Sequence, residues 1–302
     1  MTKALVIGYG SIGRRHSEVL QSMEMISEVS VLSGQENLLY RTIRSLEEIE
    51  SLAPDYIVIA SNTLRHFEEL CFLEDNFKDK TILVEKPLFG KYHDLIVQNN
   101  SVWVGYSLRF HPLMQLIRKK IERRNLWNIS VFCGSYLPEW RPGRDYRTTS
   151  SAMKDSGGGV LLDLSHELDY VQWLAGKIIP EYIVNEKISD LDIETDDFLM
   201  LAGRSEHGVV LQISLNYFTR KPVRQIIIDG EGISIQADLI TSTATVLENG
   251  SESCYSWDDF SRDDECRTEH CALLSGDFTN ACSYQEGQEL MSLIGVIRNW
   301  KN

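Results

Sequence analysis

Short apolar runs alternate with amphipathic stretches through the first third of the chain. Five of these runs predict strands: Leu5–Ile7, Val29–Leu32, Tyr56–Ala60, Ile82–Val84 and Val102–Tyr106. The segments between them carry apolar residues at helical spacing, so each strand is expected to lead into a helix. Such βαβ units build a parallel sheet that is covered by helices on both faces.

After about residue 120 the pattern changes to a strict alternation of apolar and polar residues. Residues 127–133 and 209–217 alternate in this way, and the run from Ile226 to Ala237 passes through Asp229-Gly230-Glu231-Gly232 as a hairpin does. Such strands are typical of an antiparallel sheet with one covered face. The sequence therefore predicts an α/β Rossmann domain at residues 1–118. An α+β domain with a large open, mainly antiparallel sheet is expected to follow at residues 119–302.

The open face of the second sheet has two interpretations. Solvent can cover it, or it can join copies of the chain, because Tyr217 and Phe218 are expected to lie on it. The second interpretation predicts a homodimer or homotetramer that forms through this face.

A glycine-rich segment, Gly8-Tyr9-Gly10-Ser11-Ile12-Gly13, follows the first strand and leads into the first helix. In such a segment the first glycine permits a tight turn, the second lets the backbone approach a pyrophosphate, and the third allows close packing of helix and strand. The helix N-terminus adds N–H donors and the positive end of its dipole. Dinucleotide binding is predicted for Gly8, Gly10, Ser11, Ile12, Gly13 and Arg14. The alternatives are a structural turn or another ligand, such as an S-adenosyl nucleotide.

The end of the second strand bears on the choice between NAD(H) and NADP(H). A carboxylate is expected there, about twenty residues after the loop, to accept the adenosine ribose hydroxyl of NAD. This chain has Ser33-Gly34-Gln35 instead, so a 2′-phosphate is not repelled. Arg14 and Arg41 are candidate sources of positive charge. The sequence therefore favours NADP(H), with Ser33 at the ribose.

Four segments stand in a characteristic order along the chain: Gly8–His16, Ala60–His66, Glu85-Lys86-Pro87 and Gly157–Asp169. Together they resemble the Gfo/Idh/MocA oxidoreductases, NAD(P)-dependent enzymes that act mostly on sugars and cyclitols. The resemblance implies that Lys86 contacts the reacting hydroxyl or carbonyl, that His166 is the acid/base, and that Asp163 is its partner carboxylate. It also implies cofactor contacts for a further set of residues: Ser61, Asn62, His66, Glu85 and Lys86.

The residues themselves agree with these roles. Lys86 follows the strand Ile82–Val84, and ligands of open α/β sheets bind beyond the carboxyl ends of the strands. Desolvation there lowers the pKa of a lysine and makes it a useful proton relay. On a helix predicted over Gly159–Ala175, Asp163 and His166 share the polar face. Their spacing is one residue shorter than the family's, so Asp163 or another acid pairs with the histidine.

Positive and aromatic residues gather at residues 137–147, and Arg109 adds a further positive charge just after the fifth predicted strand. The predicted substrate contacts are Lys86, Arg109, Trp140, Arg144, Tyr146, Asp163 and His166. Guanidinium groups suit carboxylates and phosphates, and aromatic rings stack on sugars. An anionic sugar, such as a sugar acid or a nucleotide-linked sugar, is therefore the expected substrate. The alternative is that the arginines only form ion pairs with acidic neighbours.

The composition limits the partners of the protein. Its 302 residues include 30 Lys+Arg against 44 Asp+Glu, a net charge of −14, which disfavours nucleic acid and anionic membranes. No apolar run approaches the ~20 residues of a membrane span, and no signal peptide is evident, so a cytoplasmic protein is expected.

The six cysteines are expected to be free thiols. A zinc site near Cys266, His270 and Cys271, flanked by Cys254 and Cys282, requires four thiols to converge from a polar segment. Free thiols are the simpler interpretation, so no metal is predicted.

Taken together, these features predict hydride transfer between NAD(P) and a sugar hydroxyl or carbonyl. One alternative is a family relative that keeps its cofactor bound and uses transient oxidation for epimerisation, elimination or glycoside cleavage. Another is a non-catalytic, cofactor-binding sensor, which the joint presence of Lys86 and His166 disfavours.

Overall fold

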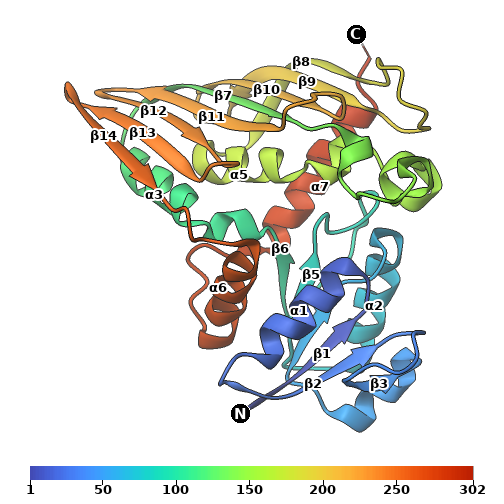
Figure 1. Ribbon diagram of the computed structural model, residues 1–302. Helices are drawn as coiled ribbons and strands as arrows, with labels where there is room; N and C mark the ends of the chain where they lie inside the picture. The colour runs from blue at the N-terminus through green and yellow to red at the C-terminus, as the bar shows by residue number, and fades with distance from the viewer. Residues whose placement is uncertain (302) are drawn as a thin grey trace. The chain divides into compact units, whose positions relative to one another are not determined.

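The computed structural model describes residues 1–301, and the chain forms two compact units (Figure 1). Unit 1 comprises Met1–Phe110 and Ser261–Ser292, and unit 2 comprises His111–Phe260 together with the C-terminal residues from Leu293. The sequence predicted a single boundary after residue 118. The observed division differs because a later segment of the chain returns to pack in unit 1.

A seven-stranded sheet, in the order β15-β6-β5-β4-β1-β2-β3, forms the centre of unit 1. Its strands are β1 (Thr2–Ile7), β2 (Ile26–Leu32), β3 (Arg41–Ile43), β4 (Tyr56–Ile59), β5 (Thr81–Glu85), β6 (Ser101–Gly105) and β15 (Cys282–Ser283). Neighbouring strands from β3 to β6 are parallel, and β15 adds an antiparallel edge. The order of the parallel strands is that of a doubly wound Rossmann sheet, which confirms the predicted fold class. All five predicted strands are present.

The helices of unit 1 come from both ends of the chain. They are α1 (Ser11–Gln21), α2 (His66–Asn76), α6 (Arg262–Ser275) and the short 3-10 helices η1 (Leu46–Leu52), η2 (Thr63–Arg65) and η3 (Ser107–Phe110). Cys266 and Leu273 of α6 join the same apolar core cluster as Val6 of β1 and Tyr56 of β4. The last helix, α7 (Tyr284–Arg298), begins in unit 1 and ends in unit 2.

Unit 2 is built on an eight-stranded sheet in the order β14-β13-β12-β11-β7-β10-β9-β8. The strands are β7 (Leu126–Gly134), β8 (Ile178–Glu186), β9 (Phe198–Ser205), β10 (Val210–Asn216), β11 (Val223–Gly230), β12 (Ile233–Asp238), β13 (Thr243–Glu248) and β14 (Ser251–Ser256). Only β7 and β10 pair in parallel among the neighbours in this sheet of residues 126–256. The mainly antiparallel sheet and the β11–β12 hairpin are thus confirmed.

Helices cover one face of the unit 2 sheet. Figure 1 shows α3 (Pro112–Ile121) and α5 (His166–Ala175) on the same side, and α4 (Val160–Asp163) contacts β9 and β10. The connection from β7 to α4 contains four short 3-10 turns: η4 (Leu137–Glu139), η5 (Tyr146–Thr148), η6 (Ser150–Ala152) and η7 (Lys154–Ser156). The alternation in β10 is realised, since Leu211 and Ile213 are buried and Gln212 is exposed.

Three sequence expectations for unit 2 are corrected. Tyr217 is fully buried, so it does not lie on the open face. Trp127, expected on the covered face, is 57% exposed because a bulge pairs Gly230 with Leu126 and skips it. The single helix predicted over residues 159–175 is divided into α4 and α5. Between them the backbone forms hydrogen bonds of the 3-10 type, from residue i to residue i−3. One such bond runs from Ser165 N–H to the Leu162 carbonyl at 3.4 Å.

Across residues 1–301, every helix falls short of the combined length and apolarity that a bilayer crossing requires. All six cysteines are free.

Candidate active site

The glycine loop joins β1 to α1, and each of its three glycines is required for a different reason. Gly8 has a φ of +95°, and a Cβ there would lie 2.6 Å from Ser61 Cα. A Cβ on Gly13 would lie 2.0 Å from the Gly8 carbonyl oxygen, so only glycine permits this packing. At Gly10, by contrast, a Cβ would meet no atom of the rest of the described chain within 4 Å, its immediate chain neighbours aside.

The start of α1 fits an anionic group. Gly10 is its N-cap, no acidic side chain stands in its first turn, and Arg14 is exposed on the same helix. The N–H groups of the first turn have no partners within a helix and are oriented toward the loop side. Ser11, Ile12 and Gly13 therefore belong to a segment that can hold a phosphate or pyrophosphate.

The loop after β2 is fastened to the glycine loop and to β3. Gln35 Nε2 donates to the Tyr9 carbonyl at 2.8 Å. The Arg44 guanidinium donates to the carbonyls of both Ser33 and Gln35. Arg41 faces Glu28, with the charged atoms 3.8 Å apart. Arg41 could be predicted from the sequence and Arg44 could not, because a contact with backbone carbonyls leaves no pattern in the sequence.

The loop after β4 is tied to the segment after β5. His66 is buried, with Nδ1 3.2 Å from the Pro87 carbonyl and Nε2 3.3 Å from the Ser61 carbonyl. Desolvation lowers the pKa of this histidine. Asn62 caps η2 through its side-chain oxygen, which accepts from Leu64 N–H at 3.0 Å. His66 and Asn62 therefore shape these loops, and their contact with a cofactor stays a prediction.

A buried carboxyl group lies behind the same loop. Ser61 Oγ donates to Glu69 Oε2 at 2.6 Å. Burial raises the pKa of Glu69 to about 7, against the opposing effects of the Ser61 hydrogen bond and the Arg65 charge. The Ser61 hydroxyl therefore uses its proton in the hydrogen bond to Glu69.

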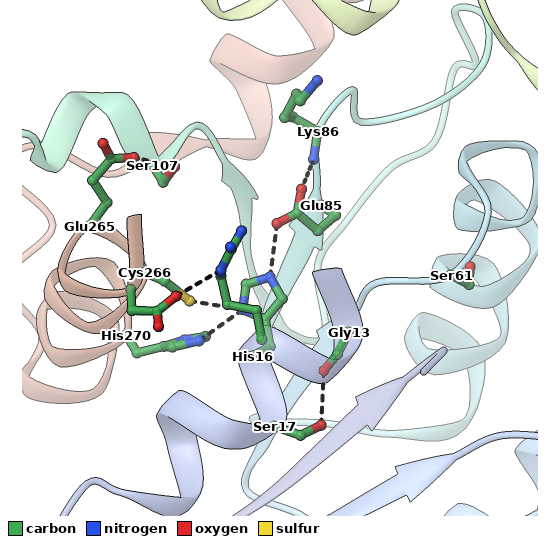
Figure 2. Close-up of polar contacts among 12 residues, drawn as sticks. Gly13, His16, Ser17, Ser61, Glu85, Lys86, Ser107, Glu265, Cys266 and His270 are labelled. Atoms are coloured by element: carbon green, nitrogen blue, oxygen red, sulfur yellow. Dashed lines mark hydrogen bonds and ion pairs between the residues drawn. The ribbon is translucent and has the colours of Figure 1, made fainter. Parts of the chain in front are cut away.

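Glu85 fixes the backbone at Lys86. Its Oε1 lies 2.8 Å from His16 Nε2, and its Oε2 accepts the Lys86 backbone N–H at 3.0 Å. Burial alone raises the pKa of Glu85, but the His16 hydrogen bond and charge outweigh this and hold the pKa below its usual range. Figure 2 shows the Lys86 side chain extending away from this carboxylate. The Lys86–Pro87 peptide bond is cis.

In unit 2, Asp163 has a hydrogen-bond partner that the sequence analysis missed. Tyr217 Oη donates to Asp163 Oδ2 at 2.6 Å. Burial, with the nearby Asp163 charge, raises the pKa of Tyr217 well above its usual value. Asp163 ends α4 and His166 begins α5, so the helix break lies between them. Pairing of Asp163 with His166 stays a prediction.

The rest of the polar face around His166 is buried in unit 2. Glu167 is 0% exposed, and Arg224 Nε donates to its Oε1 at 2.7 Å. Asp169 is also buried. These acids are structural members of unit 2 and do not form a solvated helix face.

Three predicted substrate residues lie around one hollow of unit 2. Trp140, Arg144 and Tyr146 line this shallow hollow. Trp140 is fixed by a 2.8 Å hydrogen bond from its Nε1 to Ser135 Oγ and by an edge-to-face contact with Tyr217. The neighbouring Arg147 is instead paired with Asp145 at 2.7 Å, as the alternative interpretation of these arginines expects.

Arg109 corrects the predicted substrate set. It is only 2% exposed, and its Nη1 lies 2.8 Å from Glu286 Oε1 within unit 1. The structure thus gives its charge an internal partner, in place of the substrate anion that the sequence analysis assigned to it.

Comparison with protein families identifies the second half of this architecture. Residues 114–236 match the sequence model of the GFO/IDH/MocA C-terminal domain. In this segment, which lies within unit 2, the chain is similar to members of the GFO/IDH/MocA family. The chain is also 25% identical, over 217 residues, to the 2,7-anhydro-N-acetylneuraminate hydratase of Escherichia coli (strain K12). The match covers 68% of this chain and 57% of the hydratase.

Solved structures share the fold of nearly the whole chain. Levoglucosan dehydrogenase in complex with NADH and levoglucosan superposes with a TM-score of 0.85 at 16% identity, covering 98% of this chain and 96% of that one. For UDP-N-acetylglucosamine 3-dehydrogenase from Acidithiobacillus ferrooxidans the TM-score is 0.75 at 17% identity, with the same coverage of 98% and 96%. For the WlbA dehydrogenase from Bordetella pertussis, in complex with NADH and UDP-GlcNAcA, it is 0.77 at 17% identity, covering 98% and 94%.

Proposed function

We propose that this protein is an NAD(P)-dependent oxidoreductase that acts on a CH–OH group, or the corresponding carbonyl, of a sugar or sugar derivative. The observation that carries the proposal is the arrangement of unit 1. The glycine loop follows β1 and Lys86 follows β5 in a Rossmann-ordered sheet, and ligands of such sheets bind beyond the carboxyl ends of the strands. The sugar dehydrogenases that share the fold support the substrate class.

The cofactor is proposed to bind along the glycine loop. Backbone N–H groups of Ser11, Ile12 and Gly13 would hold its pyrophosphate, and Gly10 leaves the space for it. Ser61, Asn62 and His66 would border the site from the loop after β4. The nicotinamide ring supplies the acceptor or donor of the hydride.

The reacting oxygen and its proton are assigned to two side chains, Lys86 and His166. Lys86 is proposed to bind the reacting oxygen through its ammonium group, while Glu85 holds its backbone from behind. His166 is proposed to take the hydroxyl proton during oxidation and to return it during reduction. Asp163 is proposed to orient the histidine, with its own position fixed by Tyr217.

The principal experiment measures turnover of free NAD(P)H by absorbance with a panel of sugars. Lys86→Ala and His166→Ala are each expected to lower kcat/KM by about 10²–10⁴-fold, the usual contribution of an acid–base group. Lys91→Ala, which removes an exposed lysine five residues further on, is the matched control and should have little effect. Undiminished turnover in Lys86→Ala would refute the assignment.

NADP(H) is proposed as the preferred cofactor. No carboxylate ends β2, and Arg44 brings a positive charge to the Ser33–Gln35 loop. Titration with both cofactors is expected to give a lower Kd for NADP(H), and Arg44→Ala should reduce that preference more than Arg41→Ala. Tighter binding of NAD(H) by the unchanged protein would contradict the proposal.

The substrate is proposed to be a sugar acid or a nucleotide-linked sugar. The hollow beside Trp140 and Tyr146 offers ring faces together with the exposed Arg144 guanidinium. Arg144→Ala should raise KM for anionic sugars and leave neutral sugars unaffected. Arg147→Ala is the control, because that guanidinium is already paired with Asp145. An equal rise of KM for neutral sugars would exclude recognition of the anion by Arg144.

The hydratase relative favours one second candidate. A chain that keeps its cofactor bound and uses transient oxidation can catalyse elimination, epimerisation or glycoside cleavage. It would convert substrate without net turnover of free NAD(P)H, whereas a dehydrogenase consumes one cofactor per product. Measuring product and free cofactor together in one reaction distinguishes the two.

The open face of the unit 2 sheet is proposed to join two or four copies of the chain. Phe132 and Ile227 are each 39% exposed on it, beside a hollow that Met200 also lines. Sedimentation should show a homodimer or homotetramer that Phe132→Glu with Ile227→Lys converts to monomers. An unchanged assembly would place the interface elsewhere. The free cysteines suit a reducing compartment, and the cytoplasm is the proposed location.

A further inference from the structure

Two histidines and a cysteine meet in the interior of unit 1, outside the proposed hydride transfer (Figure 2). His16 belongs to α1, and Cys266 and His270 belong to α6. His16 Nδ1 lies 2.9 Å from His270 Nε2 and 3.3 Å from Cys266 Sγ. All three side chains are buried, at 1%, 4% and 0% exposure for His16, Cys266 and His270.

We propose that this group, the His16–Cys266–His270 cluster, binds a soft late first-row transition-metal ion, Zn²⁺ or Cu⁺. One thiolate and two imidazoles form a donor set that both ions favour. Zinc bonds of about 2.0–2.1 Å to nitrogen and about 2.3 Å to sulfur separate tetrahedral ligand atoms by about 3.3–3.6 Å. The two distances from His16 Nδ1 are thus a few tenths of an ångström shorter than an ion requires, and all three donor atoms lie within 4.8 Å of one another.

The far nitrogen of each imidazole is already occupied by an oxygen atom. His16 Nε2 lies 2.8 Å from Glu85 Oε1, and His270 Nδ1 lies 2.8 Å from Tyr56 Oη. Such outer contacts fix the rings of metal-binding histidines, and a carboxylate partner increases the basicity of the ligand. With the far nitrogens carrying the protons, the lone pairs of His16 Nδ1 and His270 Nε2 both face the cluster.

Charge supports a cation at this place. The Glu85 carboxylate and the Cys266 thiolate would together offset two positive charges in an interior where an unpaired ion is costly. Binding forms the metal–sulfur bond and breaks the S–H bond of Cys266, whose proton leaves to the buffer. The balance involves no oxidation or reduction.

The cluster differs from the zinc site that the sequence analysis considered and set aside. Cys254 and Cys271 are both exposed, and Cys254 belongs to unit 2. Cys266 instead faces a histidine 250 positions away in the chain. The consequence of metal binding would be structural, since the ion would link α6 to α1 and to Glu85 behind Lys86.

Metal retention tests the proposal without any assumption about the catalysed reaction. Full-length protein is freed of metal with a chelator, exposed to Zn²⁺ or, under reducing and oxygen-free conditions, to Cu⁺, then desalted and analysed for elements. About one ion per chain is expected, and the two arms identify the preferred metal. Cys266→Ser and His270→Gln should abolish retention. Cys271→Ser, which changes an exposed thiol on the same helix, should keep it.

A spectroscopic arm needs no variant and so does not depend on whether a variant folds. Co²⁺ added to the unchanged metal-free protein should produce a thiolate-to-cobalt charge-transfer band, and Zn²⁺ should displace it. Zn²⁺ should also raise the Tm of the unchanged protein. The absence of both the band and retained metal would overturn the proposal and leave a hydrogen-bonded cluster only. Retention that persists in Cys266→Ser would overturn it as well.

Discussion

A buried ion pair holds the start of α5 against the sheet of unit 2. Glu167 of α5 has no exposed surface and receives a hydrogen bond from Arg224 of β11 at 2.7 Å. Bringing both charges out of water is costly, so the pair adds little net stability by itself. Loss of one partner is far more severe, because the other charge then stays buried without compensation.

Arg224→Met is therefore expected to lower the free energy of unfolding by about 3–5 kcal/mol. Adding Glu167→Gln should restore most of that loss, because the stranded charge is then gone. Urea unfolding of the three proteins measures both effects. Arg204→Met serves as the control, since its pair with Glu181 is exposed and worth at most about 1 kcal/mol. Equal losses for Arg204→Met and Arg224→Met would show that burial of the pair is unimportant.

A single histidine should make the stability of unit 2 depend on pH. His111 caps α3, with Nδ1 accepting from Leu113 N–H at 3.1 Å and Nε2 3.2 Å from Ser242 Oγ. Burial, aided by the Arg224 charge, lowers the pKa of His111 to about 4. The folded protein thus resists a proton that the unfolded chain accepts near pH 6.5.

The stability that His111 contributes is complete above about pH 6.5 and declines as the pH falls toward 4. Between pH 7 and 4.5 the loss should be about 2 kcal/mol greater in the unchanged protein than in His111→Asn. Asparagine does not titrate and keeps an N-cap acceptor. Urea midpoints at the two pH values supply the comparison. Parallel losses in both proteins would assign the acid sensitivity to other groups.

At the scale of elements, the five buried strands could be predicted because parallel strands covered on both faces have continuous apolar sequences. Strands of two or three residues, such as β15 and β3, are too short to form a pattern. The break between α4 and α5 was not predicted, because Asp163 and His166 keep helical spacing across it. It depends on the local tightening of the backbone, which hydrophobic periodicity does not record.

Some residues of the candidate site could likewise be predicted from the sequence, whereas their contact partners could not. The glycine loop and Lys86 could be placed because each stands directly beside a recognisable strand. The partners of the site residues could not be placed. Tyr217 reaches Asp163, and His270 reaches His16, from positions 54 and 254 residues apart in the chain. Such contacts depend on how whole elements pack, and no local pattern specifies them.

The glycines of the β1–α1 loop allow folding to be separated from ligand binding. Gly13→Ala should lower stability by about 1–3 kcal/mol or more, because its Cβ meets the Gly8 carbonyl oxygen at 2.0 Å. Gly10→Ala should cost less than about 1 kcal/mol, since its Cβ enters open space at an N-cap with a φ of −74°. It should nevertheless raise the cofactor Kd at least about tenfold, a loss of about 1.4 kcal/mol.

Thermal unfolding and cofactor titration of the two variants check this separation. Leu39→Ala, a change at a fully exposed position in unit 1, controls for nonspecific effects. Unchanged cofactor affinity in a folded Gly10→Ala protein would mean that the pyrophosphate does not approach this residue.

At the scale of the whole molecule, the chain passes between its two units three times, after Phe110, Phe260 and Ser292. The segment Ser261–Ser292 supplies α6 and the edge strand β15 to unit 1. Cys266, Leu273 and Ala281 from this segment are buried in the core cluster around β1 and β4. Unit 1 is thus completed only after residues 111–260 of unit 2 have been synthesised.

A fragment of residues 1–118, the domain that the sequence predicted, is therefore expected not to fold alone. Without α6 it would expose the apolar side of the β1–β4 core, and each large side chain left uncovered forfeits about 1.5–3 kcal/mol. That loss is a substantial fraction of the total stability of a small domain. Joining Ser261–Ser292 to Phe110 through a flexible linker should restore cooperative unfolding, whereas the same linker carrying a scrambled sequence should not. Circular dichroism with urea titration distinguishes the three chains. Cooperative unfolding of residues 1–118 alone would show that α6 covers a core that is already stable without it.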